Sequence, residues 1–305
     1  MDLPHWSQTS VQRFLECPKA WALTYVHTGA RRPLQHKQRS PSTVPHRMQV
    51  RAARATLIEQ LEALYNGEVW SDEQLEGRLM THLEQSDGSS RRYPFGLEGQ
   101  RATCLFQLRT LKQTKTLRLL HRQRVATWAY FERSQAMLVR GVRLFAAPDI
   151  MLFHHHKWTL VRLRFAPEPH PLVAEMEARL MVHWAMAHPA LPSRPDAYRL
   201  RTITWRQGAW HEGSPTATQA EQMEAWSMAL TDLNAMQFVR RQVLRDGHLA
   251  AVPLATKTSA CKACSWRSSC LGERSLASAK RDQLEGLLTL HQNEASKSAK
   301  TASTS

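Results

Sequence analysis

The apolar positions of the chain follow a helical period in some segments and alternate with polar positions in others. From about residue 48, an apolar stripe at helical spacing predicts an amphipathic helix. Between residues 158 and 165, alternation predicts a strand that turns Thr159, Val161, Leu163 and Phe165 to one face. Similar patterns predict strands at 137–142, 150–153 and 200–205, helices at 171–188 and 218–245, and one long helix followed by a strand over 101–143. This order predicts an α/β or α+β core.

The length and composition are those of a folded protein. The 305 residues (34.9 kDa) suffice for one core domain with an appended element. Hydrophobic residues make up 42% and charged residues 22%, which argues against disorder over most of the length. No apolar run approaches the roughly 18 residues of a membrane span, and the start of the chain lacks the features of a secretory signal. We therefore expect a cytoplasmic protein with no membrane partner.

The charge of the chain is strongly basic. Lys and Arg outnumber Asp and Glu by 41 to 26, which gives a formal net charge of +15 and favours a polyanionic partner. Two segments are poor in acids: 31–60 has seven basic residues and one acid, and 101–143 has ten basic residues and one acid. A solvated helix face normally carries more acidic partners. The second segment therefore predicts a surface that contacts nucleic-acid phosphates, formed by Arg109, Lys112, Lys115, Arg118 and Arg122.

The five cysteines predict a metal or cluster site. Cys261, Cys264 and Cys270 follow the spacing Cys-x2-Cys-x5-Cys, which supplies three thiolates and requires a fourth ligand. Cys17 is the candidate for that ligand, because it lies at the end of a predicted short helix, before Pro18. Taken without the distal cysteines, Cys17 would read as a buried apolar thiol. Iron–sulfur and zinc sites both remain open on the spacing.

These cysteine motifs resemble those of a known family. Ser-x-x-x-Phe-x-x-Cys-Pro near the N-terminus, paired with the C-terminal Cys-x2-Cys-x5-Cys, is similar to the iron–sulfur branch of the RecB-type PD-(D/E)XK nucleases, which includes CRISPR-associated RecB-like exonucleases and the nuclease domain of AddB. The resemblance runs from about Ser7 to Cys270. It implies a restriction-endonuclease-like central mixed sheet flanked by helices, with the ends of the domain stapled by a [4Fe-4S] cluster. Its ligands would be Cys17, Cys261, Cys264 and Cys270, with zinc as the alternative occupant; Cys104 matches nothing in the motif and would be a core thiol.

The resemblance also implies a Mg²⁺ or Mn²⁺ site, built from an Asp on one strand and an (Asp/Glu)-x-Lys on the next. Pro148-Asp149 matches the first element. On the next strand, Arg162 stands at the position of the second carboxylate and Arg164 at that of the lysine. Two cations beside Asp149 would repel a divalent metal. We therefore expect a degraded active site in which Asp149 is a remnant, and arginines that bind phosphate instead.

Other family positions are substituted as well. A histidine expected on the early helix is missing from residues 49–57, and His46 lies upstream of them. A Gln-x-x-x-Tyr pattern expected after the second strand is replaced, in the nearest frame, by Arg179 and His183.

Activity would return if another acid faced Asp149. Glu168, Glu175 and Glu177 follow the arginine-bearing strand and are the candidates, although each also reads as an ordinary solvated acid. The three consecutive histidines at 154–156 predict an exposed hairpin, because neighbouring strand residues point to opposite faces and cannot converge on one ion.

Five segments follow from these patterns: residues 1–30 with the first cluster cysteine, a basic helical region at 31–136, a nuclease-like core at 137–245, the cysteine loop at 246–272 and a flexible tail at 273–305. The leading hypothesis is a DNA-binding, catalytically degraded RecB-like protein. It would bind single-stranded DNA, or one strand within a complex that contains a helicase, a nuclease or a CRISPR-type effector. An active metal-dependent DNA exonuclease and a structural subunit that binds an acidic protein are the alternatives.

Overall fold

The computed structural model describes residues 5–26, 44–86, 96–166, 170–246, 249–262, 264–271 and 274–302. These residues form helices and two sheets that each combine parallel and antiparallel strand pairs, so the mixed α/β class predicted from the sequence is confirmed. The chain divides into two compact units: a large unit (Met1–Gln8 and Ser42–Leu230) and a small unit (Thr9–Pro41 and Thr231–Ser305). The five segments predicted above remain a prediction. Among the described residues, no helix is long and apolar enough to cross a bilayer.

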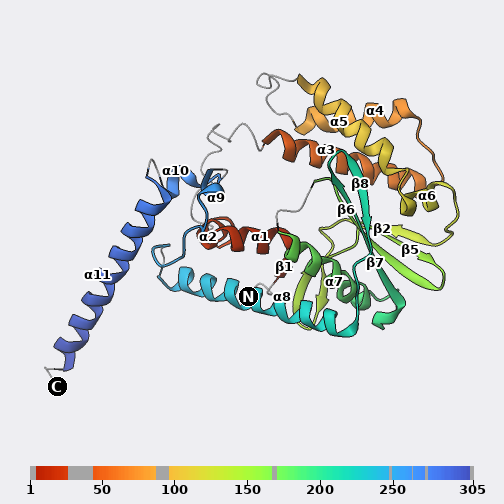
Figure 1. Cartoon of the computed structure of the whole chain (residues 1–305). Helices are drawn as coiled ribbons and strands as arrows, with labels where there is room; N and C mark the ends of the chain where they lie inside the picture. Colours follow the sequence, from red (N-terminus) through yellow and green to blue (C-terminus); the bar gives the residue numbers. More distant parts are fainter. Residues whose placement is uncertain are drawn as a thin grey trace. The chain divides into compact units, whose positions relative to one another are not determined.

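The main sheet of the large unit has five strands in the order β2-β5-β6-β7-β8 (Figure 1). The strands are β2 (Trp128–Tyr130), β5 (Ile150–His154), β6 (Lys157–Arg164), β7 (Tyr198–Arg206) and β8 (Ala209–Gly213). The β5–β6 hairpin turns at His155 and His156, both with positive φ, as expected for the histidine run. Strands β6 and β7 are parallel, and the crossover between them contains α7 (Pro171–Ala187) and a short 3-10 helix (Pro195–Ala197).

A second sheet has the order β1-β4-β3, with β1 (His5–Ser7), β3 (Met137–Val139) and β4 (Val142–Phe145). β1 runs parallel to β4, and β3 is antiparallel to it. The single strand predicted over 137–142 is therefore wrong. Arg140 and Gly141 both have positive φ and turn the chain between β3 and β4.

Helices cover both faces of the main sheet. α3 (Val44–Tyr65), α4 (Asp72–Ser86) and α5 (Gly96–Leu111) lie together over one face (Figure 1). Val161, Leu163 and Phe165 join their core, so the predicted alternation of β6 is confirmed. α7 packs on the other face, against β6 and β7.

The long helix predicted within 101–143 is wrong, because the structure divides it into α5 and α6 (Lys115–His121). Thr116 explains the new start: its backbone N–H and its hydroxyl donate to the Glu212 carboxylate of β8 at 3.2 and 3.0 Å. The Glu212 carboxylate thus accepts from a backbone N–H in the first turn of α6, where such groups have no acceptor within the helix.

The small unit joins segments from the two ends of the chain. Its elements are most of α1 (Gln8–Glu16), α2 (Pro18–Tyr25), the C-terminal part of α8 (Gln219–Asp246), α9 (Thr258–Lys262), α10 (Arg267–Cys270) and α11 (Leu276–Ala302). Trp266 Nε1 donates to Thr24 Oγ1 at 3.2 Å, and the Lys19 backbone N–H donates to the Pro253 carbonyl at 3.1 Å. Where a flexible tail was predicted, the structure has α11, which is rich in helix-forming Ala, Leu, Lys and Gln.

Candidate functional site

Asp149 accepts hydrogen bonds from three arginines at the start of β5. Arg133 binds it bidentately, with Nε to Oδ1 and Nη2 to Oδ2 both at 2.9 Å, and Arg54 Nη2 donates to Oδ1 at 2.9 Å. Arg162 Nη1 donates to Oδ2 at 3.3 Å, and the Leu163 backbone N–H donates to the same oxygen at 2.8 Å. The carboxylate is therefore surrounded by donors, which is the environment of a permanently ionised acid.

Arg162 connects Asp149 to a second buried acid, Glu177 of α7. Its Nη2 lies 3.2 Å from Glu177 Oε1, and Arg164 Nη2 lies 3.2 Å from Glu177 Oε2. Arg164 also donates to the Ala174 carbonyl at 2.8 Å. Along β6, Arg162 and Arg164 alternate with Val161 and Leu163, which belong to the core under α3 and α5. Neighbouring strand residues point to opposite faces, so the two arginines point to the face on which α7 packs. We call Arg54, Arg133, Asp149, Arg162, Arg164 and Glu177 the arginine–carboxylate cluster.

The charges of this cluster shift its pKa values. Burial by itself would raise the pKa of Asp149, but the charges of Arg133, Arg162 and Arg54 and the hydrogen bond from Arg133 bring that pKa below its ordinary value. Burial, assisted by the charge of Arg133, lowers the pKa of Arg54 to about 10. Burial also lowers the pKa of Arg162, although the charge of Glu177 opposes the shift. The guanidinium groups are thus held close to one another in a partly desolvated site.

The structure corrects one expectation about this site. Arg162 and Arg164 were expected to contact nucleic acid, but their side chains are 1% and 10% exposed and both are ion-paired with Glu177. Neither guanidinium is available to a strand at the surface. Asp149 lies beside Arg162 as the sequence predicted, and Arg162 also reaches Glu177, one of the three acids considered. Glu175 pairs with Arg179 instead, and Glu168 lies outside the described residues.

The two residues at the expected Gln-x-x-x-Tyr positions have other partners. Arg179 Nη2 lies 3.2 Å from the Glu221 carboxylate of α8, in addition to its pair with Glu175. His183 Nε2 lies 3.1 Å from the Gln222 carbonyl, and its ring packs against Trp226. Both residues therefore connect α7 to the first part of α8 within the large unit.

Sequence reasoning missed two members of the cluster, Arg54 and Arg133. Arg54 lies in α3, within the segment 49–57 where the resemblance implies a histidine. Arg133 follows β2 and is one of the ten basic residues of the acid-poor segment 101–143. The scarcity of acidic residues in the segments 31–60 and 101–143 was the available signal. It did not identify Asp149 as their partner, because that residue is 95 positions from Arg54 and 16 from Arg133.

The four predicted cluster cysteines all lie in the small unit. Cys17 is the N-cap of α2, and its Sγ accepts from the Ala20 backbone N–H at 3.4 Å. Cys261 lies in α9, Cys270 ends α10, and Cys17 and Cys270 pack against the same apolar cluster as Cys261. Cys264 N–H donates to the Cys261 carbonyl at 3.2 Å. Cys104 is instead a buried thiol of the large-unit core, where burial raises its pKa to about 12.

The four thiols are close enough to influence one another. Burial raises the pKa values of Cys261, Cys264 and Cys270, and the thiol of Cys17 raises each of them further. Basic side chains oppose this effect, with Lys19 acting on Cys270 and Arg13 on Cys264. Among the described residues, no three His, Cys, Asp or Glu side chains lie in a metal-binding arrangement. The chemistry of the donor set, four thiols with Lys19 and Arg13 nearby, is nevertheless that of thiolate ligands, because coordinated thiols are deprotonated.

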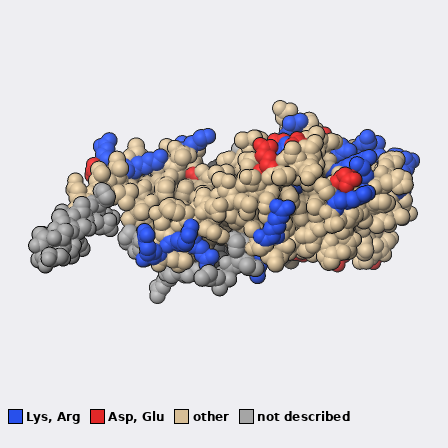
Figure 2. All heavy atoms as spheres, turned by 90° about the horizontal axis from the view of Figure 1, so that it is seen from below, with Lys and Arg blue, Asp and Glu red and all other residues tan. Residues whose placement is uncertain are grey.

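Four of the five residues of the predicted phosphate-contacting surface are exposed: Arg109, Lys115, Arg118 and Arg122. Arg109 also pairs with Asp72 at 3.0 Å. Lys112 is half-buried, and burial lowers its pKa. On the face drawn in Figure 2, Lys and Arg are more widespread than Asp and Glu. Of the other acid-poor segment, residues 31–43 lie outside the described residues.

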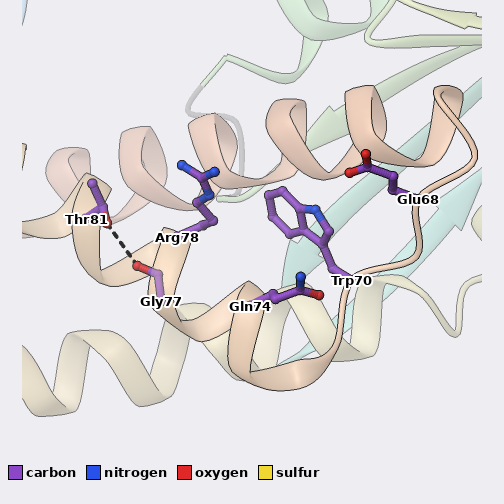
Figure 3. A pocket seen from close by; sticks show the side chains of 6 residues that line it. All are labelled: Glu68, Trp70, Gln74, Gly77, Arg78 and Thr81. Carbon is purple, nitrogen blue, oxygen red and sulfur yellow. Dashed lines mark hydrogen bonds between the residues drawn. The ribbon is translucent and has the colours of Figure 1, made fainter.

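A separate surface cavity of about 450 Å³ lies along α4 and the loop before it. It is lined by Glu68, Trp70, Gln74, Gly77, Arg78 and Thr81, whose hydroxyl donates to the Gly77 carbonyl (Figure 3). None of these residues belongs to the arginine–carboxylate cluster.

Comparison with known proteins does not place the chain in a family. No protein-family model matches it, and no curated protein is significantly similar to it.

Proposed function

We propose that this protein binds DNA through a RecB-like PD-(D/E)XK fold whose catalytic site no longer cuts, and that it acts as a subunit of a nucleic-acid-processing complex. The observation that carries the proposal is the position of Arg162. Its guanidinium lies between Asp149 and Glu177, 3.3 Å from one carboxylate and 3.2 Å from the other. A divalent ion shared by these two acids would need the same space.

The chemistry of the cluster supports the loss of cleavage. Mg²⁺ and Mn²⁺ bind through hard oxygen ligands and use them to activate water. Here the Asp149 oxygens accept from Arg54, Arg133 and Arg162, and the Glu177 oxygens pair with Arg162 and Arg164. A metal would have to displace these guanidinium groups against their own charge.

The charge of the whole chain supports DNA as the partner. The net charge of +15 and the exposed basic residues of α6 provide attraction to a phosphate backbone. An acidic protein would be attracted by the same charge, and the salt dependence of DNA binding distinguishes the two.

Cys17, Cys261, Cys264 and Cys270 would hold a [4Fe-4S] cluster, or zinc in the alternative. Either centre would supply a structural link between the N-terminal helices and the C-terminal segment of the small unit.

A nuclease assay tests the proposal. Purified protein with Mn²⁺ is incubated with end-labelled single-stranded DNA, beside the Asp149→Ala variant. We expect no metal-dependent degradation by either protein. Degradation by the wild type that Asp149→Ala abolishes would establish an active exonuclease.

A filter-binding titration of the same DNA over a range of salt concentrations tests the proposal that the protein binds DNA. We expect an affinity that falls steeply with salt. If the protein binds no DNA at low salt, DNA is not the partner, and the alternative hypothesis of a structural subunit that binds an acidic protein is favoured.

A further inference from the structure

We propose that the arginine–carboxylate cluster binds one phosphate of the nucleic-acid backbone, with Arg54 and Arg133 as the contacting side chains. The inference rests on the proposed DNA-binding function and names the place where the strand is held. The position at which the RecB-type nucleases that this sequence resembles would bind a metal would then bind a phosphate directly, without a metal.

The cluster carries more positive than negative charge. Its six side chains comprise four guanidinium groups and two carboxylates, those of Asp149 and Glu177, so together they carry two more positive than negative charges. The strongest charge effects on Arg54 come from other members of the cluster, with Arg133 first. Holding like charges together in a desolvated site is unfavourable, and a bound anion would offset that cost.

Two of the four arginines are more accessible from outside than the others. The side chains of Arg54 and Arg133 are 27% and 29% exposed, whereas those of Arg162 and Arg164 are 1% and 10% exposed. Arg54 comes from α3 and Arg133 from the turn after β2, and both meet at Oδ1 of Asp149. An anion that approaches the cluster would therefore meet these two guanidinium groups first.

The donors suit a phosphate. Among the described residues, Nη2 is the only guanidinium nitrogen of Arg54 with a hydrogen-bond acceptor, which leaves part of its planar donor fork for a ligand. Guanidinium groups bind phosphate oxygens bidentately, and this geometry favours arginine where a phosphate is recognised through two parallel hydrogen bonds. Among the described residues, the buried Nε atoms of Arg162 and Arg164 also have no hydrogen-bond acceptor.

The test compares DNA binding and phosphate binding in matched variants. Arg54→Gln removes one accessible guanidinium group. Arg101→Gln is the control, because Arg101 is also a partly exposed arginine of the large unit (34%) that pairs with carboxylates, those of Glu76 and Glu98. Affinity for a single-stranded oligonucleotide is measured from low to moderate salt. Melting temperature is measured in inorganic phosphate and in chloride at equal ionic strength.

We expect Arg54→Gln to bind DNA about tenfold more weakly and to lower the slope of log affinity against log salt by about 0.7–0.9, the value for one phosphate on a single or double strand. Phosphate should raise the melting temperature of the wild type and of Arg101→Gln more than that of Arg54→Gln. A general salting effect of phosphate would be equal in all three proteins. The phosphate arm reports a free anion, and the oligonucleotide arm reports a backbone phosphate.

The outcomes separate the two proposals. If the wild type binds no DNA at low salt, the proposed function fails. If the wild type binds DNA and Arg54→Gln retains its affinity, salt slope and phosphate response, the phosphate site is overturned while DNA binding stands. Should Arg54→Gln not fold, Arg54→Lys is measured in both assays. It keeps the charge, so its salt slope should match that of the wild type, but it loses the fork. Wild-type DNA affinity together with a wild-type phosphate response in that variant would therefore overturn the site as well.

Discussion

Nη2 of Arg162 lies 3.2 Å from Oε1 of Glu177, and the two side chains are only 1% and 3% exposed. Arg164 reaches the other oxygen of the same carboxylate. Glu177 is therefore the counter-ion for two arginines on one strand, and it comes from the helix that packs over them. Buried charges of this kind are tolerated only with their partners in place.

Removing the charge of Glu177 should destabilise the large unit. Glu177→Gln leaves Arg162 and Arg164 without their shared counter-ion, and we expect a loss of about 3–5 kcal/mol in the free energy of unfolding. Urea denaturation followed by circular dichroism measures it. Glu175→Gln is the control on the same helix, because the Glu175 side chain is 48% exposed and its loss should cost under about 1 kcal/mol. Equal effects of the two substitutions would contradict the structural role of Glu177.

The stability of the protein should fall in acid because of Asp149. The folded-state pKa of Asp149 is lower than its ordinary value of 3.8, so its ionised form stabilises the fold at every pH above that value. This contribution is lost as the pH falls below 3.8 toward the folded-state pKa. Asp149→Asn should be less stable than the wild type at neutral pH, and the difference should shrink in acid. The urea midpoints of the two proteins, measured from neutral pH to the acid limit of solubility, give this difference in stability. If the difference stayed constant over that range, the pKa of Asp149 would not differ between the folded and unfolded states.

The four cysteines of the small unit, Cys17, Cys261, Cys264 and Cys270, should together bind one metal centre. We expect protein purified without oxygen to be brown and to contain iron and sulfide, and Cys264→Ser to lose both. Cys104→Ser is the matched control, because Cys104 is buried in the core of the large unit, apart from the set. Colourless wild-type protein with bound zinc would favour the alternative metal. Wild-type protein with neither metal would contradict a thiolate centre.

The exposed basic residues of α6 and its C-cap should contribute to DNA affinity through charge alone. A triple variant of Lys115→Gln, Arg118→Gln and Arg122→Gln should lower the salt slope by about two to three, because each residue would neutralise one phosphate. Arg194→Gln is the control, since Arg194 is also exposed and lies outside the predicted surface. A filter-binding titration measures the slope. Identical slopes for the wild type and the triple variant would place the DNA-contacting surface elsewhere.

Local patterns in the sequence were sufficient for many elements. Alternation identified β6, and helical spacing identified α7 and α8 to within a few residues. These elements could be predicted because one face of each is buried, and burial imposes its period on the sequence. The β3–β4 turn and the break between α5 and α6 were missed. The break depends in part on the Glu212 carboxylate, which lies 96 residues from Thr116.

The candidate site was predicted in part. The register of β6 placed Arg162 beside Asp149, and the structure places their side chains in contact. Arg162 and Arg164 were expected to bind phosphate, and their burial could not be predicted, because a charged strand residue is buried only when a partner such as Glu177 comes from another element. Arg54 and Arg133 could not be assigned to Asp149 from their own surroundings in the sequence.

The sequence by itself determined the excess of basic residues, the spacing of the cysteines and the placement of Arg162 and Arg164 two residues apart on one strand. Only the tertiary structure decided which arginines are buried and which are accessible. It buries Arg162 and Arg164 against Glu177, and it leaves Arg54 and Arg133 partly exposed at Asp149. The reason is physical: whether a guanidinium group meets a carboxylate or solvent depends on which helix packs over its strand, and that packing joins residues that are distant in the chain.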